Sequence, residues 1–243
     1  MAEPVRITFL GGLGEIGRNC AAMELAGRIL LIDCGVMFPD LEMPGVDLVL
    51  PDFTWLRDNG DRVEGCVLTH GHEDHAGGLA FLLRELSFPI YGSALSLGLA
   101  RNRMEEAGVL HRTQLVTVRD GERRRIGPFD VEFIPVTHSV PDGFATAYHT
   151  PQGVILHSGD FKLDLTPVDG RVTDLARIGA IDPRRVCVIS TGSQGEPMSA
   201  LSLMAAGENK WLSVGEGDLV IMSSHAIPGN EMNVGRVIDG LHR

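Results

Sequence analysis

The chain has 243 residues, 44% of them hydrophobic, so it can bury a full core as one large domain or two small ones. Its formal net charge of −11 argues against a protein that coats DNA or RNA regardless of sequence, because such proteins neutralise phosphates with Lys and Arg. A nuclease is not excluded, since bound metal ions bring local positive charge. No apolar stretch approaches a membrane span and the first residues lack a secretion signal, so we expect a cytoplasmic protein with no membrane partner.

Short aliphatic and β-branched runs, separated by turn residues, predict strands along much of the chain. In chain order these strands are expected at residues 5–10, 28–33, 47–51, 62–68, 88–92, 114–118, 130–136 and 153–160. Helical patterns occur at 76–87 and 94–107, and Gly108 is placed to end the second helix. Because the strands are too closely spaced for a regular alternation of strand and helix, we expect mixed sheets with helices on an outer face.

A glycine-rich stretch, GGLGEIG at residues 11–17, follows the first predicted strand. Gly12, Gly14 and Gly17 have the spacing of a dinucleotide-binding loop, and Asp33 ends the next strand at a suitable distance. However, the segment RNCAAMELAGR at residues 18–28 is also typical of one arm of a hairpin, and it is barely long enough for a crossover helix. We therefore favour glycines that let the backbone pass close to a metal cleft over nucleotide binding.

The densest group of ionisable side chains is HGHEDH at residues 70–75. A polar loop in which Asp74 caps the next helix is the simpler interpretation. Three histidines and one aspartate at these offsets, however, arise by chance in roughly one chain in a thousand or fewer, which favours a metal site. Neutral imidazoles with carboxylates favour zinc, and manganese is the next candidate.

The spacing within this group predicts two neighbouring ions. At the end of an extended strand, side chains two apart point the same way, so His70, His72 and Asp74 share one side and His75 points elsewhere. His70 and His72 suit a first ion, whereas Asp74 and His75 suit a second. Glu73 points away and is expected to face solvent.

Two other predicted strands end in a candidate ligand, His138 after residues 130–136 and Asp160 at the end of 153–160. Each alone is more often a turn residue, but metal sites commonly collect ligands from the ends of neighbouring strands. His157 lies inside an apolar run and is expected to be a hydrogen-bonded core histidine. The histidines without such a setting are His111, His149 and His242.

The four cysteines lie far apart in the sequence and within apolar runs. This pattern predicts reduced, buried thiols and no cysteine-based zinc site. The residues concerned are Cys20, Cys34, Cys66 and Cys187.

Asp33 in LLIDCG, HGHEDH at 70–75, THS around His138 and SGD around Asp160 resemble the successive motifs of the metallo-β-lactamase superfamily. LGGLGEIGRN, PGVDLVLPD, TGSQGEPMSAL and IPGNE narrow the resemblance to the ribonuclease J family of its β-CASP branch, over nearly all of the chain. The resemblance implies an α/β fold, an αββα sandwich of two mixed β-sheets with outer helices, plus a remnant of the β-CASP domain.

The resemblance also implies a site with two Zn²⁺ ions, or manganese in their place. By similarity, His70, His72 and His138 hold the first ion, Asp74 and His75 hold the second, Asp160 bridges them, and Asp33 orients a ligand histidine. Asp74 and Asp160 are thereby the expected catalytic residues. A hydroxide activated by the two zincs would attack an RNA phosphodiester in line.

The activity implied is zinc-dependent RNA hydrolysis, both 5′ to 3′ and internal, in RNA maturation and decay, including rRNA processing. The implied substrate is single-stranded RNA, preferably 5′-monophosphorylated, and the full-length protein is implied to be a homodimer. Two alternatives stay open. One is a small-molecule hydrolase of the glyoxalase II kind, against which TGSQGEP and IPGNE count, and the other is a catalytically incomplete metal-binding fragment.

In the family a large β-CASP domain is inserted into the lactamase-like domain, and here most of that insert is absent, with an apparent junction near Ala180 and Ile181. We expect residues 1–180 to form the N-terminal part of the lactamase-like domain and 181–243 the closing part of the β-CASP domain. The family's DSTN and HxSGH motifs, its final metal-binding histidine and its C-terminal domain are not found, so this chain alone is expected to be inactive. His225 ends an apolar run but is a weak ligand candidate, because the family usually has no histidine there.

Overall fold

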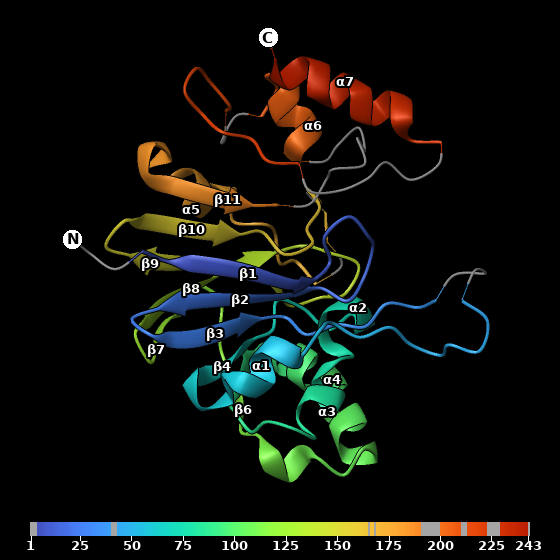
Figure 1. Ribbon diagram of the computed structural model, residues 1–243. Coiled ribbons are helices and arrows are strands. Elements are labelled where there is room, and N and C mark those ends of the chain that lie inside the picture. Colours follow the sequence, from blue (N-terminus) through green and yellow to red (C-terminus); the bar gives the residue numbers. More distant parts are fainter. Residues whose placement is uncertain are drawn as a thin grey trace.

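Two mixed β-sheets lie face to face, with helices packed outside them (Figure 1). This computed structural model describes residues 4–39, 43–164, 166–167, 169–190, 200–209, 213–222 and 229–242. The two sheets and their outer helices confirm the α/β sandwich expected from the sequence.

The first sheet has six strands in the order β1-β2-β3-β4-β5-β6. Strand β2 is antiparallel to its neighbours β1 and β3, whereas β3, β4, β5 and β6 are parallel. Their bounds are β1 Arg6–Gly11, β2 Cys20–Leu25, β3 Arg28–Ile32, β4 Val63–Val67, β5 Ile90–Gly92 and β6 Leu115–Thr117.

The second sheet has five strands in the order β11-β10-β9-β8-β7. Neighbours are antiparallel except for β10 and β11, which are parallel. Their bounds are β7 Arg123–Ile126, β8 Phe129–Val136, β9 Gly143–Thr150, β10 Gly153–His157 and β11 Val186–Ile189.

The helices follow the parallel strands and the ends of the second sheet (Figure 1). The α-helices are α1 Thr54–Asp58, α2 Glu73–Ala76, α3 Leu79–Leu82, α4 Ala94–Glu106, α5 Leu175–Gly179, α6 Ala200–Ala205 and α7 Glu231–Leu241. Short 3₁₀ turns lie at η1 Gly60–Arg62, η2 Leu110–Arg112 and η3 Pro183–Arg185. Within the described residues no helix is long and apolar enough to cross a membrane.

Strand β3 shows how the layers are held together. Ile29 and Leu31 pack into the cluster under the helices, whereas Leu30 and Ile32 pack into the cluster between the sheets. Since successive side chains point to opposite faces, a strand buried on both faces needs this unbroken apolar run. A third cluster lies on the outer face of the second sheet and includes Ile178 of α5.

Most of the predicted strands are present, but the one at 47–51 is wrong. Val49 forms only an isolated bridge with Met37, so this run pairs with no strand of either sheet, although Leu50 packs against the core cluster under the helices. The stretch before β3 is the hairpin strand β2, antiparallel to β1, and this confirms the hairpin interpretation over a dinucleotide-binding crossover. Strands β7, β9 and β11 were not predicted.

The helix predicted at 76–87 is wrong in its extent: only α3, Leu79–Leu82, forms within it, and α2 ends at Ala76. Gly77 and Gly78 lie at the break, where the Gly78 N–H donates to the Cys34 carbonyl at 2.8 Å. A Cβ on Gly78 would lie 2.6 Å from the Gly35 carbonyl oxygen, so this close approach requires glycine. The second predicted helix is confirmed, and Gly108, with φ of +69°, follows its end.

Three cysteines are buried free thiols as predicted, and Cys187 is the exception. It is exposed on β11, at the edge of the second sheet, where an apolar run in the sequence does not guarantee burial. Burial raises the pKa of Cys34 and of Cys66, so both thiols are protonated at neutral pH.

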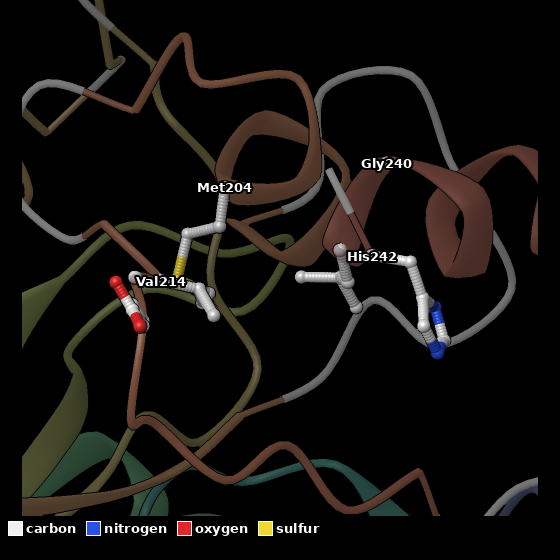
Figure 2. A pocket seen from close by; sticks show the side chains of 7 residues that line it. Met204, Val214, Gly240 and His242 are labelled. Carbon is white, nitrogen blue, oxygen red and sulfur yellow. The ribbon is translucent and has the colours of Figure 1, made fainter.

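Helices α6 and α7 pack against each other at the end of the chain (Figure 1). Gly240 allows the contact, because a Cβ there would lie 2.6 Å from the Ala205 carbonyl oxygen. A cavity of about 450 Å³ lies beside them, and Figure 2 labels Met204, Val214, Gly240 and His242 on its wall.

Candidate metal centre

The histidine-rich segment occupies the turn between β4 and α2. Strand β4 ends at Val67, and His72 precedes the first residue of α2 in extended conformation, with φ of −69° and ψ of 153°. His138 follows β8, Asp160 follows β10, and Asp33 follows β3. The candidate site therefore gathers side chains from strand ends of both sheets, as the sequence predicted.

Three histidines form the first group of possible ligands, His70, His72 and His138. Their rings are mutually edge-on, with centroids 4.8 to 4.9 Å apart. Nε2 of His70 lies 3.0 Å from Nδ1 of His72. Two nitrogens bound to one tetrahedral zinc ion lie about 3.3 Å apart, so this pair fits a shared ion.

A second group consists of His75 with the carboxylates of Asp74 and Asp160. Nε2 of His75 lies 3.6 Å from Oδ2 of each aspartate. Asp160 Oδ2 is also 3.8 Å from Nε2 of His138, so this carboxylate lies between the two groups. A ring nitrogen of His70 also lies within 4.8 Å of ligand atoms of His75 and Asp160, but one nitrogen binds one ion, and His70 Nε2 lies 3.0 Å from His72.

Asp33 fixes the orientation of the His75 ring. Its carboxylate is 1% exposed and accepts hydrogen bonds from the Thr69 N–H at 2.8 Å, the Thr69 hydroxyl at 2.8 Å and Nδ1 of His75 at 2.7 Å. Because the only hydroxyl hydrogen of Thr69 goes to Asp33, Nδ1 of His70 must donate to the Thr69 oxygen, 3.1 Å away. Nε2 of both histidines then faces the centre and is available to a metal.

The pKa values of His70 and His75 are shifted in opposite directions. Burial lowers the pKa of His70 to about 3, which keeps its Nε2 lone pair free at neutral pH. Burial also opposes charge on His75, but the carboxylates of Asp33 and Asp160 outweigh it and raise its pKa to about 10. Asp160 is desolvated too, yet its hydrogen bond with His75 and the histidine charges lower its pKa. The space around Nε2 of His75 thus favours a positive charge, as a divalent ion would supply.

Backbone hydrogen bonds and close backbone contacts hold the second group in place. Asn19 donates its N–H to the Asp74 carbonyl at 3.0 Å, and Cys34 donates to the His75 carbonyl at 2.8 Å. Gly35 passes so close that a Cβ would lie 1.6 Å from the Asp74 oxygen. The sequence does not single out Asn19 or Thr69, because an isolated amide or hydroxyl belongs to no recognisable spacing pattern. The two residues only occur within the family-like segments GRN and LTH.

The remaining candidates have other partners. Glu73 is exposed and its carboxylate accepts from Arg103 at 2.9 Å, as expected of a solvent-facing residue. Nδ1 of His157 accepts from the Gly159 N–H at 3.2 Å, and burial lowers the pKa of that histidine. His149 pairs with Glu132 on the outer face of the second sheet, 2.8 Å away. His225 lies outside the described residues.

This donor set suits a borderline-soft divalent ion, because imidazole nitrogens and carboxylate oxygens converge in it. In His70 and His75 the other ring nitrogen, Nδ1, is already hydrogen-bonded. Such a site, at strand ends between two sheets covered by helices, defines a protein with the metallo-β-lactamase fold. The chain belongs to the beta-lactamase superfamily, whose domain matches residues 28–182. The family "Ribonuclease J, beta-CASP domain" matches residues 163–241.

The chain resembles curated ribonuclease J proteins. Ribonuclease J of Synechocystis sp. is 47% identical over 197 residues, which cover 80% of this chain and 31% of that protein. Ribonuclease J of Mycobacterium tuberculosis is 34% identical over 344 aligned positions, which cover 98% of this chain and 61% of that protein. This chain therefore spans less than two thirds of either relative.

The second alignment also contains an internal gap. It has 344 positions, whereas the chain has 243 residues, so at least 101 positions of the Mycobacterium protein have no counterpart here. Among solved structures, a diphosphatase from the PhnP family is similar with a TM-score of 0.51 and 16% identity, over 74% of this chain and 72% of that one. This likeness concerns the fold alone.

Proposed function

We propose that this chain is the metal-binding part of a hydrolase of the ribonuclease J type, which cleaves RNA phosphodiester bonds. The observation that carries the proposal is the convergence of His70, His72, His138, His75 and Asp160 from three chain segments, which follow β4, β8 and β10. The match to the ribonuclease J β-CASP family over residues 163–241 supports RNA as the substrate class. It also counts against a small-molecule hydrolase of the glyoxalase II kind.

The proposed ligands divide between two ions. His70, His72 and His138 hold the first, Asp74 and His75 hold the second, and Asp160 serves both. Support comes from the 3.0 Å approach of His70 to His72 and from the position of Asp160 Oδ2, 3.6 Å from His75 and 3.8 Å from His138. Zinc suits this nitrogen-rich set, and manganese is the alternative.

The chain's own residues prepare this site in two ways. Asp33 and Thr69 fix the tautomers of His75 and His70, so that each presents Nε2. Asp160 provides a carboxylate between the two ligand groups. Bound ions would supply Lewis acidity toward phosphate oxygens and lower the pKa of a water nucleophile. Asp74 and Asp160 are the proposed catalytic residues.

The finer activity follows the resemblance to the ribonuclease J family and is part of the proposal. We infer action on single-stranded RNA, preferably with a 5′ monophosphate, by both 5′ to 3′ and internal cleavage, in cytoplasmic RNA maturation and rRNA processing. A homodimer is proposed for the full-length protein. The proposed domain division is 1–180 for the lactamase-like part and 181–243 for the closing part of the β-CASP domain.

A second candidate function is a metal-binding module without catalysis. The observation that favours it is the internal gap of at least 101 positions against the Mycobacterium relative. Both candidates use the same ligands, so metal binding supports either of them and RNA cleavage separates them.

Metal content tests the ligand assignment. We expect the native chain, loaded with Zn²⁺ and dialysed, to retain two ions by elemental analysis. Asp160→Ala should lose metal because it removes the carboxylate between the groups. Glu73→Ala is the matched control, since Glu73 is a neighbouring acid that pairs with Arg103 outside the site.

Two results would overturn these assignments. A native chain that retains neither zinc nor manganese would remove the metal-dependent proposal altogether. Equal zinc content in Asp160→Ala and Glu73→Ala would leave the metal site in place but show that Asp160 is not a ligand.

A further inference from the structure

Asn19 reaches the second ligand group from outside it. Its Nδ2 lies 3.1 Å from the Asp74 carbonyl oxygen, 3.5 Å from Asp74 Oδ2 and 3.2 Å from His75 Nε2. Its backbone is tied to the same segments, because it donates to the Asp74 carbonyl and accepts from the Gly35 N–H at 2.9 Å. One residue therefore contacts both proposed ligands of the second ion.

The orientation of the Asn19 amide is fixed by its neighbours. The Asp74 carbonyl only accepts hydrogen bonds, so the amide group facing it must be the NH₂. Oδ1 then lies against Gly12, where a Cβ would come within 2.9 Å of it. Gly12 has φ of +82°, a conformation that favours glycine, and this keeps the space that the amide occupies.

The second N–H of the amide is available to the Asp74 carboxylate. Among the described residues, Asn19 is the hydrogen-bond donor to that carboxylate. The side chain of Asp74 is 33% exposed. His75 is already held through Nδ1 by Asp33. Asp74 thus depends on Asn19 for its orientation more than His75 does.

We propose that Asn19 is a positioning residue for the second metal ion, which aims the Asp74 carboxylate beside Nε2 of His75. This inference rests on the proposed two-ion site. A hydrogen-bonded partner behind a metal ligand orients it, and its loss weakens metal binding about 10- to 100-fold. Within the described part of the chain no hydrogen bond links Asn19 to His72 or His138, so the effect is expected to fall on the second ion.

The experiment is a calorimetric titration of the full metal-free chain with Zn²⁺, repeated with Co²⁺ to follow the two sites by absorption. Asn19→Ala should keep the affinity of the first ion and weaken the second about 10- to 100-fold. Asn59→Ala is the matched control, because Asn59 also donates its amide to a backbone carbonyl, that of Trp55, at 2.8 Å, but lies at the other end of β4. It should leave both affinities unchanged.

Circular dichroism of each metal-free variant separates folding from metal binding. If Asn19→Ala does not fold, Asn19→Ser replaces it, since a serine hydroxyl is too short to reach the Asp74 carboxylate, and the same asymmetric loss is expected. Unchanged second-site affinity in a folded variant, or equal weakening of both sites, overturns the role of Asn19. A native chain that binds no ion at all would instead overturn the proposed function on which this role depends.

Discussion

At the scale of single residues, the site depends on a buried carboxylate, Asp33, that lies outside both ligand groups. Asp33 has φ of +57°, a left-handed conformation that Asp tolerates better than most residues, and it ends β3 there. Burial alone would raise its pKa, but the charge and hydrogen bond of His75 lower it. A permanent negative charge under the histidines is therefore built into the fold.

Thr69 links Asp33 to His70 through its hydroxyl group, and a substitution can test this role. Thr69→Val keeps the shape but removes the donor to Asp33 and the acceptor for His70. We expect the free energy of unfolding of the metal-free chain to fall by about 1–3 kcal/mol, because a buried partner is left unsatisfied. Affinity for the first ion should fall about 10-fold.

The measurements for Thr69→Val are urea unfolding in chelator and competitive zinc titration. Thr113→Val is the control, since the Thr113 hydroxyl donates to the Phe88 carbonyl at 2.7 Å, outside the metal centre. It should lower stability without changing zinc affinity. Identical zinc binding by Thr69→Val and the native chain would show that the Thr69 hydroxyl does not support His70.

The ligand candidates were predictable from the sequence, whereas their supports were not. HGHEDH has a spacing that few other structures need, and His138 and Asp160 end recognisable strands. Thr69 and Asn19 are single polar residues whose partners lie 36 and 55 positions away, Asp33 and Asp74 respectively. Only the fold brings such pairs together.

At the scale of elements, prediction succeeded where a segment's own residues determine its structure. Strand β3 is a continuous apolar run, and α4 ends at a glycine suited to positive φ. Strand β2 (CAAMEL) contains Ala and Glu, which are depleted in strands, and in β9 (GFATAYHT) Gly and Ala interrupt the Phe, Thr and Tyr residues. Both strands are paired on both sides. Such tertiary pairing is not encoded in local pattern.

Helix α5 illustrates how a short element is attached to a sheet. Ile178 is buried against the outer face of the second sheet, and Arg177 forms an ion pair with Glu132 of β8. Glu132 is 6% exposed and also pairs with His149. Burial would raise the pKa of Glu132, but its hydrogen bonds with Arg177 and His149 lower it.

This pKa shift predicts how the attachment depends on pH. Because the folded-state pKa lies below the ordinary value of 4.5, the stabilisation is present above about pH 4.5 and is lost as the pH falls through the folded-state pKa. Glu132→Gln should lower the free energy of unfolding by about 1–3 kcal/mol at pH 7. The difference from the native chain should shrink in acid.

Denaturant unfolding of both proteins from pH 7 down to pH 3 measures this effect. Asp130→Asn on the same strand is the control, since Asp130 pairs with Arg123 at the surface and its loss should cost less than about 1 kcal/mol. A Glu132→Gln deficit that stays constant as the pH falls would contradict ionisation of Glu132 as its cause.

At the scale of the whole molecule, the chain remains continuous across the predicted junction. Ile178 and Ile181, on either side of Ala180, share one buried cluster. Strand β11 then pairs parallel with β10, and the Ser158 N–H donates to the Ile189 carbonyl at 2.8 Å beside the metal-centre turn. Strand β11, which the proposed division places in the β-CASP part, is therefore also the edge strand of the second sheet.

Within the alignment to the Mycobacterium protein, at least 101 positions of that protein have no counterpart in this chain. A two-metal site accelerates in-line attack only on a phosphate held in a fixed position near it. The net charge of −11 gives no general attraction for RNA that would compensate. Metal binding and RNA cleavage should therefore be separable in this chain.

We expect the 243-residue chain to degrade 5′-monophosphorylated RNA at least about 100-fold more slowly than a chimera carrying the relative's unmatched segment between Ala180 and Ile181, because a poorly positioned phosphate costs at least that much. The measurement is release of mononucleotides from labelled single-stranded RNA in zinc or manganese buffer. His72→Ala in the chimera controls for contaminating nuclease and should abolish release. Rapid release by the short chain, itself abolished by His72→Ala, would mean that the metal centre positions RNA without the additional segment.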